Sequence, residues 1–510
     1  PGDEARIKIV KDCGRYAFGI LDQLLTPSPD RGEVDCPAAG PCGGCSLRHL
    51  DYAAELRAKQ ENVADAFARI GGLDVPVLPI VGSPEVNRYR NKVQFPVGVD
   101  KSGKPCIGFY AGRTHRIVPC PDCRLQPGVL NEIGNALCAF FAEKGIQPYS
   151  EETGRGLVRH IFLRRGAHSG QIMVCLVCTR AKLPSAEELC SRLKAQFAEI
   201  TTILLNVNAK NTNVILGTET HTLYGQGYIE DTLCGVPVQL GPLSFYQVNT
   251  LAAEQLYGIA AQYAQLTPDD LLLDLYCGMG TIGLSMAAHC RELIGVEIVP
   301  EAIESAKANA ARMGADVAAK SRFFCADAGQ AATRLAAEGL HPDIVMLDPP
   351  RKGCDEATLS AVVRMSPRRV VYVSCNPATA ARDAAWLEQN GYHAKKVQPV
   401  DLFPRTRHCE AVLLLSKLNV DRHIEVEVSM DEPDVTAAES KATYNEIREH
   451  VWEHHQLKVS NLYIAQVKQK YGIIERENYN KPKSENAKQP KCPKEKEDAI
   501  VEALKHFQMI

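Results

Sequence analysis

Strand and helix signals alternate from about residue 270 to residue 416, and this alternation constrains the fold more than any other feature. Segments with helical spacing cover 282–288 and 300–312. Apolar segments of strand length begin at Leu271, Leu293, Ile344, Val370 and Ala411. This order is typical of βαβ units arranged around a parallel sheet. We therefore expect an α/β domain over 241–418.

The rest of the chain predicts smaller and different units. Residues 1–35 contain two short β segments, and residues 36–240 contain a cysteine cluster, a helix over 52–70 and β-rich, mixed sequence. An acidic, turn-forming linker over 421–440 precedes a helix, a turn and a helix over 443–470, and a short helix ends the chain. We expect domain limits at 1–35, 36–240, 241–418 and 419–510.

Composition limits the class of protein. The 510 residues are 45% hydrophobic and 23% charged, which is the balance of a soluble globular enzyme. No apolar run approaches the length of a bilayer span, and the first residues are polar and acidic, unlike a signal peptide. We therefore expect a cytoplasmic protein with no membrane contact and with thiols rather than disulfides, and we expect a monomer.

Charge is uneven along the chain. The net charge of −3 does not indicate a nucleic-acid binder, but residues 86–124 contain eight Lys or Arg and two Asp, a net charge of +6. Such a patch can follow the phosphates of a nucleic acid, or it can be an ordinary solvated surface.

A glycine-containing turn follows the first strand of the α/β region. It reads Asp274-Leu-Tyr-Cys-Gly-Met-Gly-Thr, and glycine lets a backbone approach a ligand closely. Glu297 ends the next strand, where a carboxylate can accept hydrogen bonds from ribose hydroxyls, and Asp327 ends the third, beside an adenine position. A Gly-x-Gly alone also fits a tight βα turn. The spacing lacks the third glycine of an NAD site and the Lys of a P-loop, so a methyl-donor site is the better interpretation.

Two more motifs follow apolar strands and so belong to the same sheet edge. They are Leu347-Asp-Pro-Pro-Arg-Lys-Gly and Val373-Ser-Cys-Asn-Pro. Alone, Cys375 would be a buried core thiol, but Asn376-Pro377 places it in a turn, where catalytic side chains are common. Glu410, just before the last strand, is a candidate general base or an ordinary surface carboxylate.

A third pattern is Cys36-x5-Cys42-x2-Cys45, set among Gly and Pro. It needs a fourth ligand, and Cys120 and Cys123 are both candidates. Four thiolates can bind zinc or a [4Fe–4S] cluster, and the spacing alone does not separate the two. The Cys-x3-Cys-x2-Cys spacing of radical S-adenosylmethionine enzymes is absent from the sequence.

Five ordered motifs resemble the RNA (uracil-C5)-methyltransferase family over roughly residues 1–416. Besides the three strand-end motifs, they include Phe245-Tyr-Gln-Val-Asn and Asp401-Leu-Phe-Pro-x-Thr-x-His-x-Glu. The resemblance implies a Rossmann-like S-adenosylmethionine methyltransferase domain. It also implies that Cys375 adds to C6 of uracil as a nucleophile and that Glu410 accepts the C5 proton. The implied donor-binding residues are Gln247, Tyr276, Thr281, Glu297, Asp327 and Asp348.

The resemblance also concerns the RNA. Phe245 would stack on a target base that has left its stack, while Arg351 is our own candidate for stabilising the enolate oxygen and could equally be a solvent-exposed side chain. Members of the family that act on ribosomal RNA carry the cysteine spacing seen here, which implies a [4Fe–4S] cluster on Cys36, Cys42, Cys45 and Cys123. The expected substrate is therefore uracil in 23S rRNA, and the alternative is a T-loop uridine in tRNA.

The two ends of the chain differ from the family core. Residues 1–35 resemble only the second half of a TRAM domain, a small OB-like barrel, and residues 421–510 lie outside the family core. The C-terminal helices could contact RNA or protein or could be a packing appendage, and we assign no site there. An exocyclic-amine methyltransferase would carry an aromatic residue in place of Arg351, and a cluster-bearing RNA sensor would not need Cys375, Asp348 and Glu410.

Overall fold

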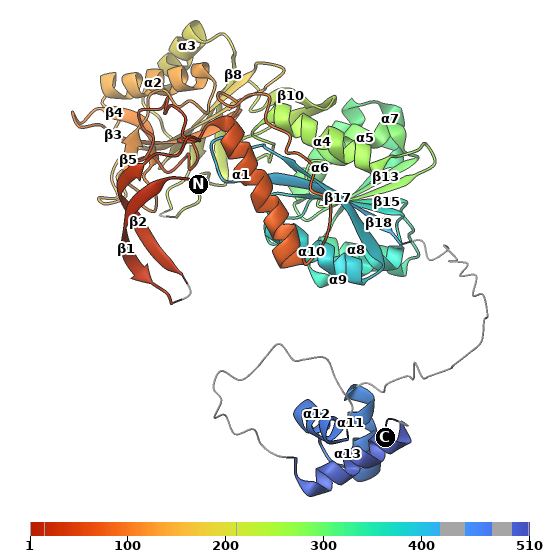
Figure 1. Ribbon diagram of the computed structural model, residues 1–510. Coiled ribbons are helices and arrows are strands. Elements are labelled where there is room, and N and C mark those ends of the chain that lie inside the picture. The colour runs from red at the N-terminus through yellow and green to blue at the C-terminus, as the bar shows by residue number, and fades with distance from the viewer. Residues whose placement is uncertain are drawn as a thin grey trace. The chain divides into compact units, whose positions relative to one another are not determined.

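The computed structural model describes residues 2–14, 16–210, 212–418, 444–471, 492–507 and 509. Contacts divide the chain into two compact units, Pro1–Asp421 and Arg422–Ile510 (Figure 1). The predicted linker over 421–440 lies outside the described residues, as does most of the Lys/Asn/Pro-rich stretch that follows the second C-terminal helix. Within the described ranges, no helix combines the length and the apolar character that a membrane span needs.

A seven-stranded mixed sheet forms the C-terminal half of the first unit. Its strands are β12 (Leu271–Leu275), β13 (Glu292–Glu297), β14 (Ser321–Cys325), β15 (Ile344–Leu347), β16 (Arg369–Ser374), β17 (Tyr392–Val400) and β18 (Glu410–Lys417). They lie in the order β14-β13-β12-β15-β16-β18-β17. The first five are parallel, as expected, but β18 is antiparallel to both β16 and β17. The sequence therefore predicted the parallel part and missed both β17 and the reversal.

Helices cover both faces of the mixed sheet. Successive side chains of a strand point to opposite faces of a sheet, and here the side chains on both faces are apolar. Leu272 packs on one side, with α4 (Thr250–Ala264), α5 (Thr281–Met286), η2 (Ala287–His289), α6 (Pro300–Arg312) and α7 (Ala315–Lys320). Leu273 packs on the other, with α8 (Ala328–Ala337), α9 (Glu356–Met365) and α10 (Pro377–Gln389). The predicted helix over 282–288 is the α5 and η2 pair. This two-faced covering is the doubly wound arrangement expected for buried parallel strands.

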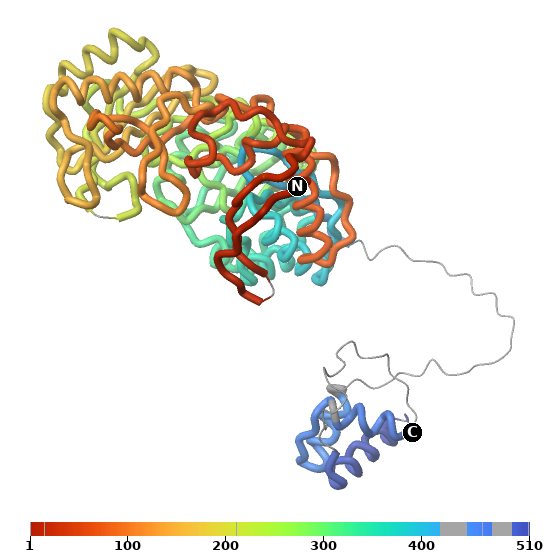
Figure 2. Tube along the Cα trace, turned by 60° about the vertical axis from the view of Figure 1, so that its left-hand side comes forward, coloured from red at the N-terminus to blue at the C-terminus, as the bar shows by residue number. Residues whose placement is uncertain are grey.

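A segment from far upstream also packs on this sheet. Helix α1 (Tyr52–Asp65) continues into a π-helical turn, η1 (Ala66–Gly71), and ends where Gly72 adopts a left-handed φ of 63°. Val63 and Phe67 join the core that α10 also enters, and Val77 and Val81 pair with β17. Figures 1 and 2 show this upstream segment, in orange, beside the C-terminal half of the first unit. Residues 52–81, although they fall within the predicted 36–240 domain, thus pack against the mixed sheet.

The central sheet lies between these segments in the sequence. Its order is β5-β4-β3-β6-β7-β8-β9, and only β7 and β8 are parallel. One face packs under α2 (Gly128–Glu143) and α3 (Ala186–Gln196), and the other joins the core of the hairpin β10–β11 and α4. The bounds are β3 (Lys92–Val99), β4 (Pro105–Tyr110), β5 (Ile117–Pro119), β6 (Val158–Arg165), β7 (Ile172–Cys178), β8 (Ile200–Val207), β9 (Glu219–Tyr224), β10 (Ile229–Leu233) and β11 (Val236–Leu240).

The N-terminal residues form a two-stranded antiparallel hairpin, β1 (Glu4–Asp12) and β2 (Ala17–Thr26). It projects from the first unit, and nearly all of its residues are exposed (Figure 1). Two strands alone do not close a barrel, so the described residues contain only the hairpin part of the predicted TRAM-like segment.

The described residues of the second unit form three helices, α11 (Tyr444–His455), α12 (Asn461–Lys470) and α13 (Lys494–His506). Ser460 caps α12 by accepting a hydrogen bond from the Tyr463 N–H. Ile447, Ile464 and Ile500 are fully buried in a shared core. This matches the predicted order of helix, turn, helix and final helix.

Candidate functional site

Five of the predicted site residues lie at one edge of the mixed sheet. Tyr276 follows β12, Glu297 ends β13, Asp327 lies two residues beyond β14, Asp348 follows β15 and Cys375 follows β16. These strands are parallel, so their carboxyl ends meet at the same edge, which is where open α/β sheets bind ligands.

The turn after β12 carries the unusual backbone conformations that its glycines predict. Gly278 and Gly280 have φ values of 55° and 78°, and Tyr276 also has a left-handed φ, of 65°. The Gly278 N–H donates to Glu297 Oε2 at 3.1 Å, so the turn and the end of β13 hold each other in place. Glu297 Oε1 accepts from the N–H groups of Ile298 and Val299, at 2.8 and 3.0 Å.

Three carboxyl groups stand at this edge: Asp274 and Glu410 are buried, and Asp348 is half-buried. Burial raises the pKa of Asp274 to about 8 and that of Asp348 to about 7. Burial and the charge of Asp348 raise the pKa of Glu410 to about 8. Asp274 Oδ2 accepts from the Gly283 N–H at 3.0 Å, while its Oδ1 has no hydrogen-bond partner. Buried carboxylates without a counter-ion favour a cationic ligand, and the sulfonium and ammonium of S-adenosylmethionine fit that need.

The reversal of β18 is what brings Glu410 to Cys375. Ser374 pairs with Ala411 across the antiparallel strands β16 and β18, so the next position along this register places Cys375 opposite Glu410. Glu410 is 7% exposed, and Cys375 is of intermediate exposure. Burial, Glu410 and Asp348 raise the pKa of the Cys375 thiol.

Arg351 lies beside this thiol. Its guanidinium donates a hydrogen bond to Cys375 and lowers the pKa of both Cys375 and Glu410 relative to what burial alone would give. Asn376 fixes the two loops together, because its Nδ2 donates to the Arg351 carbonyl at 3.0 Å and its side chain caps α10. Arg351 is also exposed to solvent.

The remaining donor-site residues come from outside the sheet. Tyr257, on α4, shares a hydrogen bond of 3.3 Å with Thr281. Burial raises the pKa of Tyr257, and a hydrogen bond with Gln247 offsets part of that rise. The structure thus brings Gln247 and Thr281 together through Tyr257, a residue that no sequence motif indicated.

Asp327, at the sheet edge, caps α8 by accepting a hydrogen bond from the Gln330 N–H at 3.1 Å.

Phe245 lies on an exposed loop between β11 and α4, and 72% of its surface is open to solvent. The loop is held from the central sheet. Arg164, 1% exposed, donates to the carbonyls of Gly241 and Ser244, at 2.7 Å each. Asn91 donates to the Gln247 carbonyl at 2.7 Å. An aromatic ring presented in this way can stack on a nucleic-acid base.

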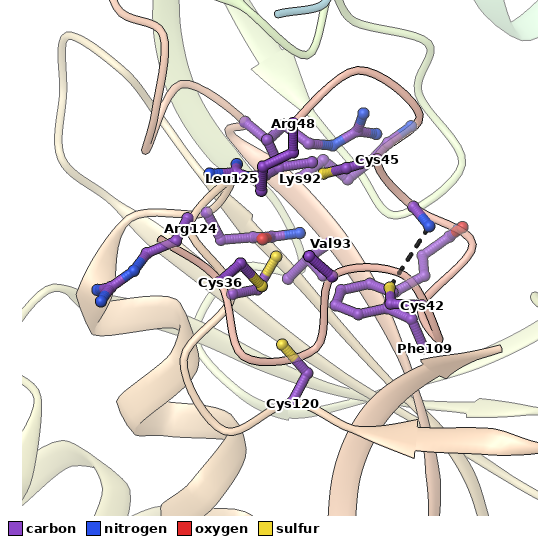
Figure 3. Close-up of a pocket in the computed structure, with 16 residues that line it drawn as sticks. Cys36, Cys42, Cys45, Arg48, Lys92, Val93, Phe109, Cys120, Arg124 and Leu125 are labelled. Atoms are coloured by element: carbon purple, nitrogen blue, oxygen red, sulfur yellow. Dashed lines mark hydrogen bonds between the residues drawn. The ribbon is translucent and has the colours of Figure 1, made fainter. Parts of the chain in front are cut away.

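The cysteines of the cluster line a cavity of about 260 Å³ in the central region (Figure 3). Cys120 and Cys123 both reach it, together with Cys36, Cys42 and Cys45. Four cations also line the cavity, and they are Arg48, Arg90, Lys92 and Arg124. Among the described residues, no three His, Cys, Asp or Glu side chains are grouped in a way that could hold a metal ion.

Cys123 and Cys120 differ in their surroundings. A hydrogen bond from the Cys120 thiol and backbone N–H groups of Leu125 and Gln126 lower the pKa of Cys123. The same contact with Cys123 and burial raise the pKa of Cys120. The backbone N–H groups beside Cys123 are contacts that favour its thiolate form. Burial raises the pKa of the Cys45 thiol, and a hydrogen bond from Arg48 offsets part of that rise.

Known proteins are similar to this chain over most of the first unit. Residues 167–418 match the model of the family described as tRNA (Uracil-5-)-methyltransferase. A Bacillus cereus protein named an uncharacterized RNA methyltransferase is 42% identical over 419 residues, which cover 82% of this chain and 90% of that protein. A Halalkalibacterium halodurans protein of the same description is 43% identical over 420 residues, covering 82% of this chain and 91% of that protein.

A solved structure is similar in the same region. It is the crystal structure of Pyrococcus abyssi tRNA (uracil-54, C5)-methyltransferase in complex with S-adenosyl-L-homocysteine. It is 27% identical, has a TM-score of 0.65, and matches over 81% of this chain and 93% of that chain. The family expected from the five motifs is thereby confirmed: the chain belongs to the RNA (uracil-C5)-methyltransferase family, the S-adenosylmethionine-dependent enzymes that methylate uracil in RNA.

Proposed function

We propose that this enzyme methylates uracil C5 in 23S rRNA, with Cys375 as the covalent nucleophile and Glu410 as the base. The observation that carries the chemistry is the pairing of a thiol and a buried carboxyl across β16 and β18, with the guanidinium of Arg351 on the thiol. Uracil C5 is a weak nucleophile, so the reaction needs a group that activates the ring and can leave again, and a thiolate does both.

The steps follow from the positions of these groups. The Cys375 thiolate forms a bond to C6, and the C5–C6 electron pair moves to give an enolate whose charge Arg351 can stabilise. C5 then attacks the methyl carbon of the sulfonium donor, whose carbon–sulfur bond breaks. Glu410, as a carboxylate, takes the C5 proton, the C5–C6 double bond forms again and the Cys375 thiolate leaves.

The donor-binding roles of the other residues are part of the same proposal. Glu297 would bind the ribose hydroxyls and Asp327 the adenine, while Gln247, Tyr276, Thr281 and Asp348 would surround the rest of the donor. The buried Asp274, with one oxygen unpartnered, supports a cationic ligand at this place. Phe245 would stack on the flipped uracil.

The resemblance of the cysteine spacing to that of the ribosomal-RNA members of the family supports 23S rRNA as substrate and a [4Fe–4S] cluster on Cys36, Cys42, Cys45 and Cys123. Four thiolates could also bind one zinc ion, and the metal analysis described below separates the two. A four-iron cluster takes one thiolate on each iron, so its ligands surround a body, as these cysteines surround a cavity. The four lining cations suit the net negative charge of such a cluster. Bound there, it would hold the cysteine segments together.

Replacing Cys375 with Ala should lower methyl transfer at least about a thousandfold and should abolish the covalent adduct with 5-fluorouridine RNA, since the attacking atom is lost. The measurement is denaturing electrophoresis of the protein–RNA mixture beside a methyl-transfer assay. Cys325→Ala, which removes an exposed cysteine, is the matched control and should behave as wild type. An adduct that survives the Cys375 change would overturn the assignment.

Replacing Arg351 with Gln should raise the pKa of the Cys375 thiol, because it removes the hydrogen bond and the charge that stabilise the thiolate. At a fixed pH near 8, we expect Cys375 to be alkylated about 3- to 30-fold more slowly, at about tenfold for each unit of pKa. Site-resolved mass spectrometry after iodoacetamide treatment across pH 6–10 measures this. Arg382→Gln removes a guanidinium that pairs with Asp383 and is the control. Identical pH curves for Arg351→Gln and wild type would contradict the role.

Replacing Cys42 with Ser should remove the brown absorbance of anaerobically purified protein, because one of four cluster ligands is lost. Iron and zinc analysis of both proteins gives the metal content. Cys106→Ser, which changes a half-buried cysteine that does not line the cavity, should leave the colour unchanged. A colourless wild type with one zinc per chain would refute the cluster.

Deleting the gene should remove C5-methyluridine from 23S rRNA and leave the tRNA T-loop unchanged. Mass-spectrometric mapping of both RNAs from the deletion strain, and from the strain complemented with the Cys375→Ala variant, makes this comparison. Loss of the modification from tRNA alone would establish the alternative substrate. The matched family model and the Pyrococcus abyssi enzyme are both described as tRNA methyltransferases.

A further inference from the structure

The loop between β17 and β18 is held by contacts at four successive backbone carbonyls. Leu402 O accepts from Asn249 Nδ2 at 3.0 Å, and Pro404 O accepts from the Tyr89 hydroxyl at 3.0 Å. Arg405 O accepts from the backbone N–H groups of Ser46 and Leu47, at 3.0 Å each. Phe403 O accepts from the Lys59 ammonium at 3.1 Å. The loop leads directly into Glu410, and we call its residues 401–408 the base loop.

Among these contacts, the one made by Lys59 carries the largest desolvation cost, because its charge is buried. Its ammonium lies 2.7 Å from Glu55 Oε1 and 2.8 Å from Asp401 Oδ1, and the three side chains are 2%, 0% and 0% exposed. Taking three charges out of water is expensive and is offset only when they pair with good geometry. Asp401 is the first residue of the base loop, so Lys59 joins α1 to the loop at both Asp401 and Phe403.

The surrounding hydrogen bonds leave little freedom in this arrangement. The Tyr52 hydroxyl donates to Asp401 Oδ2 at 3.0 Å, and Glu55 Oε1 accepts from the Arg405 N–H at 2.7 Å. The Arg405 guanidinium lies 3.6 Å from Glu55, and Arg405 has a left-handed φ of 70°. The charges of Lys59 and Arg405 thus balance those of Glu55 and Asp401. These contacts explain how the strained backbone of Arg405 is held in place.

We propose that Lys59 is a positioning residue for the base Glu410. It acts through Asp401 and the Phe403 carbonyl, which set the path of the base loop into β18. Lys59 contacts neither the thiol nor the donor-site residues described above, so its loss should affect proton removal from C5 and leave the earlier steps in place. The inference rests on the proposed function, because it requires Glu410 to be the base.

The order of the chemical steps gives a signature specific to this role. The Cys375–C6 bond and the new methyl group are both made before Glu410 acts. A misplaced base therefore stalls the reaction at a methylated covalent adduct, which can be trapped on ordinary uridine RNA. General loss of the fold would instead lower adduct formation and methyl transfer together.

The test compares Lys59→Met with wild type in a single turnover, using donor labelled in the methyl group, a 23S rRNA transcript and denaturing electrophoresis. We expect the labelled protein–RNA adduct to accumulate at least about tenfold over wild type. The first-order rate of methyl transfer and the dissociation constant of the donor should stay within about threefold of wild type. Lys59→Arg, which keeps the charge, should restore most of the release of product.

Two further variants separate the role of Lys59 from that of Glu410 and from a general effect of removing a lysine. Glu410→Gln should accumulate the same adduct, and Lys320→Met, which removes a lysine that donates to the Cys290 carbonyl, should not. If Lys59→Met does not fold, the double variant Lys59→Met, Glu55→Gln removes one charge of each sign and should give the same adduct. Accumulation in Glu410→Gln without accumulation in a folded Lys59 variant would overturn the role of Lys59 alone. Absence of the adduct in Glu410→Gln would instead count against the proposed function.

Discussion

The antiparallel insertion of β18 between β16 and β17 is the constraint on which the site depends. Five parallel strands bring Tyr276, Glu297, Asp327, Asp348 and Cys375 to one sheet edge, but a parallel strand could not start at the edge where its neighbours end. Because β18 runs in the opposite direction, its first residue, Glu410, lies at the end of β16 beside Cys375. The thiol and the carboxyl that we propose as nucleophile and base thereby lie side by side at the end of β16.

The electrostatics of the edge complement this geometry. Asp274 and Glu410 are buried and Asp348 is half-buried. The pKa values of all three carboxyl groups are raised, so without a ligand they favour the neutral acid near neutral pH. A sulfonium donor would favour their ionised forms and so prepare Glu410 to accept a proton. Raised carboxyl pKa values also mean that the folded state holds protons more tightly than the unfolded chain. Their burial therefore costs stability progressively as the pH rises from about 4 to about 8.

Sequence reasoning was strongest where a short motif coincides with the end of a strand. The sequence predicts Glu297, Asp348 and Cys375 because an apolar run ends beside each of them, and the structure places all three at one edge. Tyr257 and Lys59 could not be predicted in this way, since each lies on an ordinary amphipathic helix and gains its role only from tertiary contacts. The reversal of β18 was missed for a related reason: pattern and propensity indicate that a strand exists but not its direction.

The most direct measurement of the central claim is to identify the residue that carries the RNA. Wild-type protein would be trapped on 23S rRNA containing 5-fluorouridine and digested, and the nucleotide-bearing peptide would be sequenced by mass spectrometry. The chain has nineteen cysteines, so the result is informative. We expect the nucleotide on Cys375. A nucleotide on any other cysteine, or on a different residue type, would contradict it.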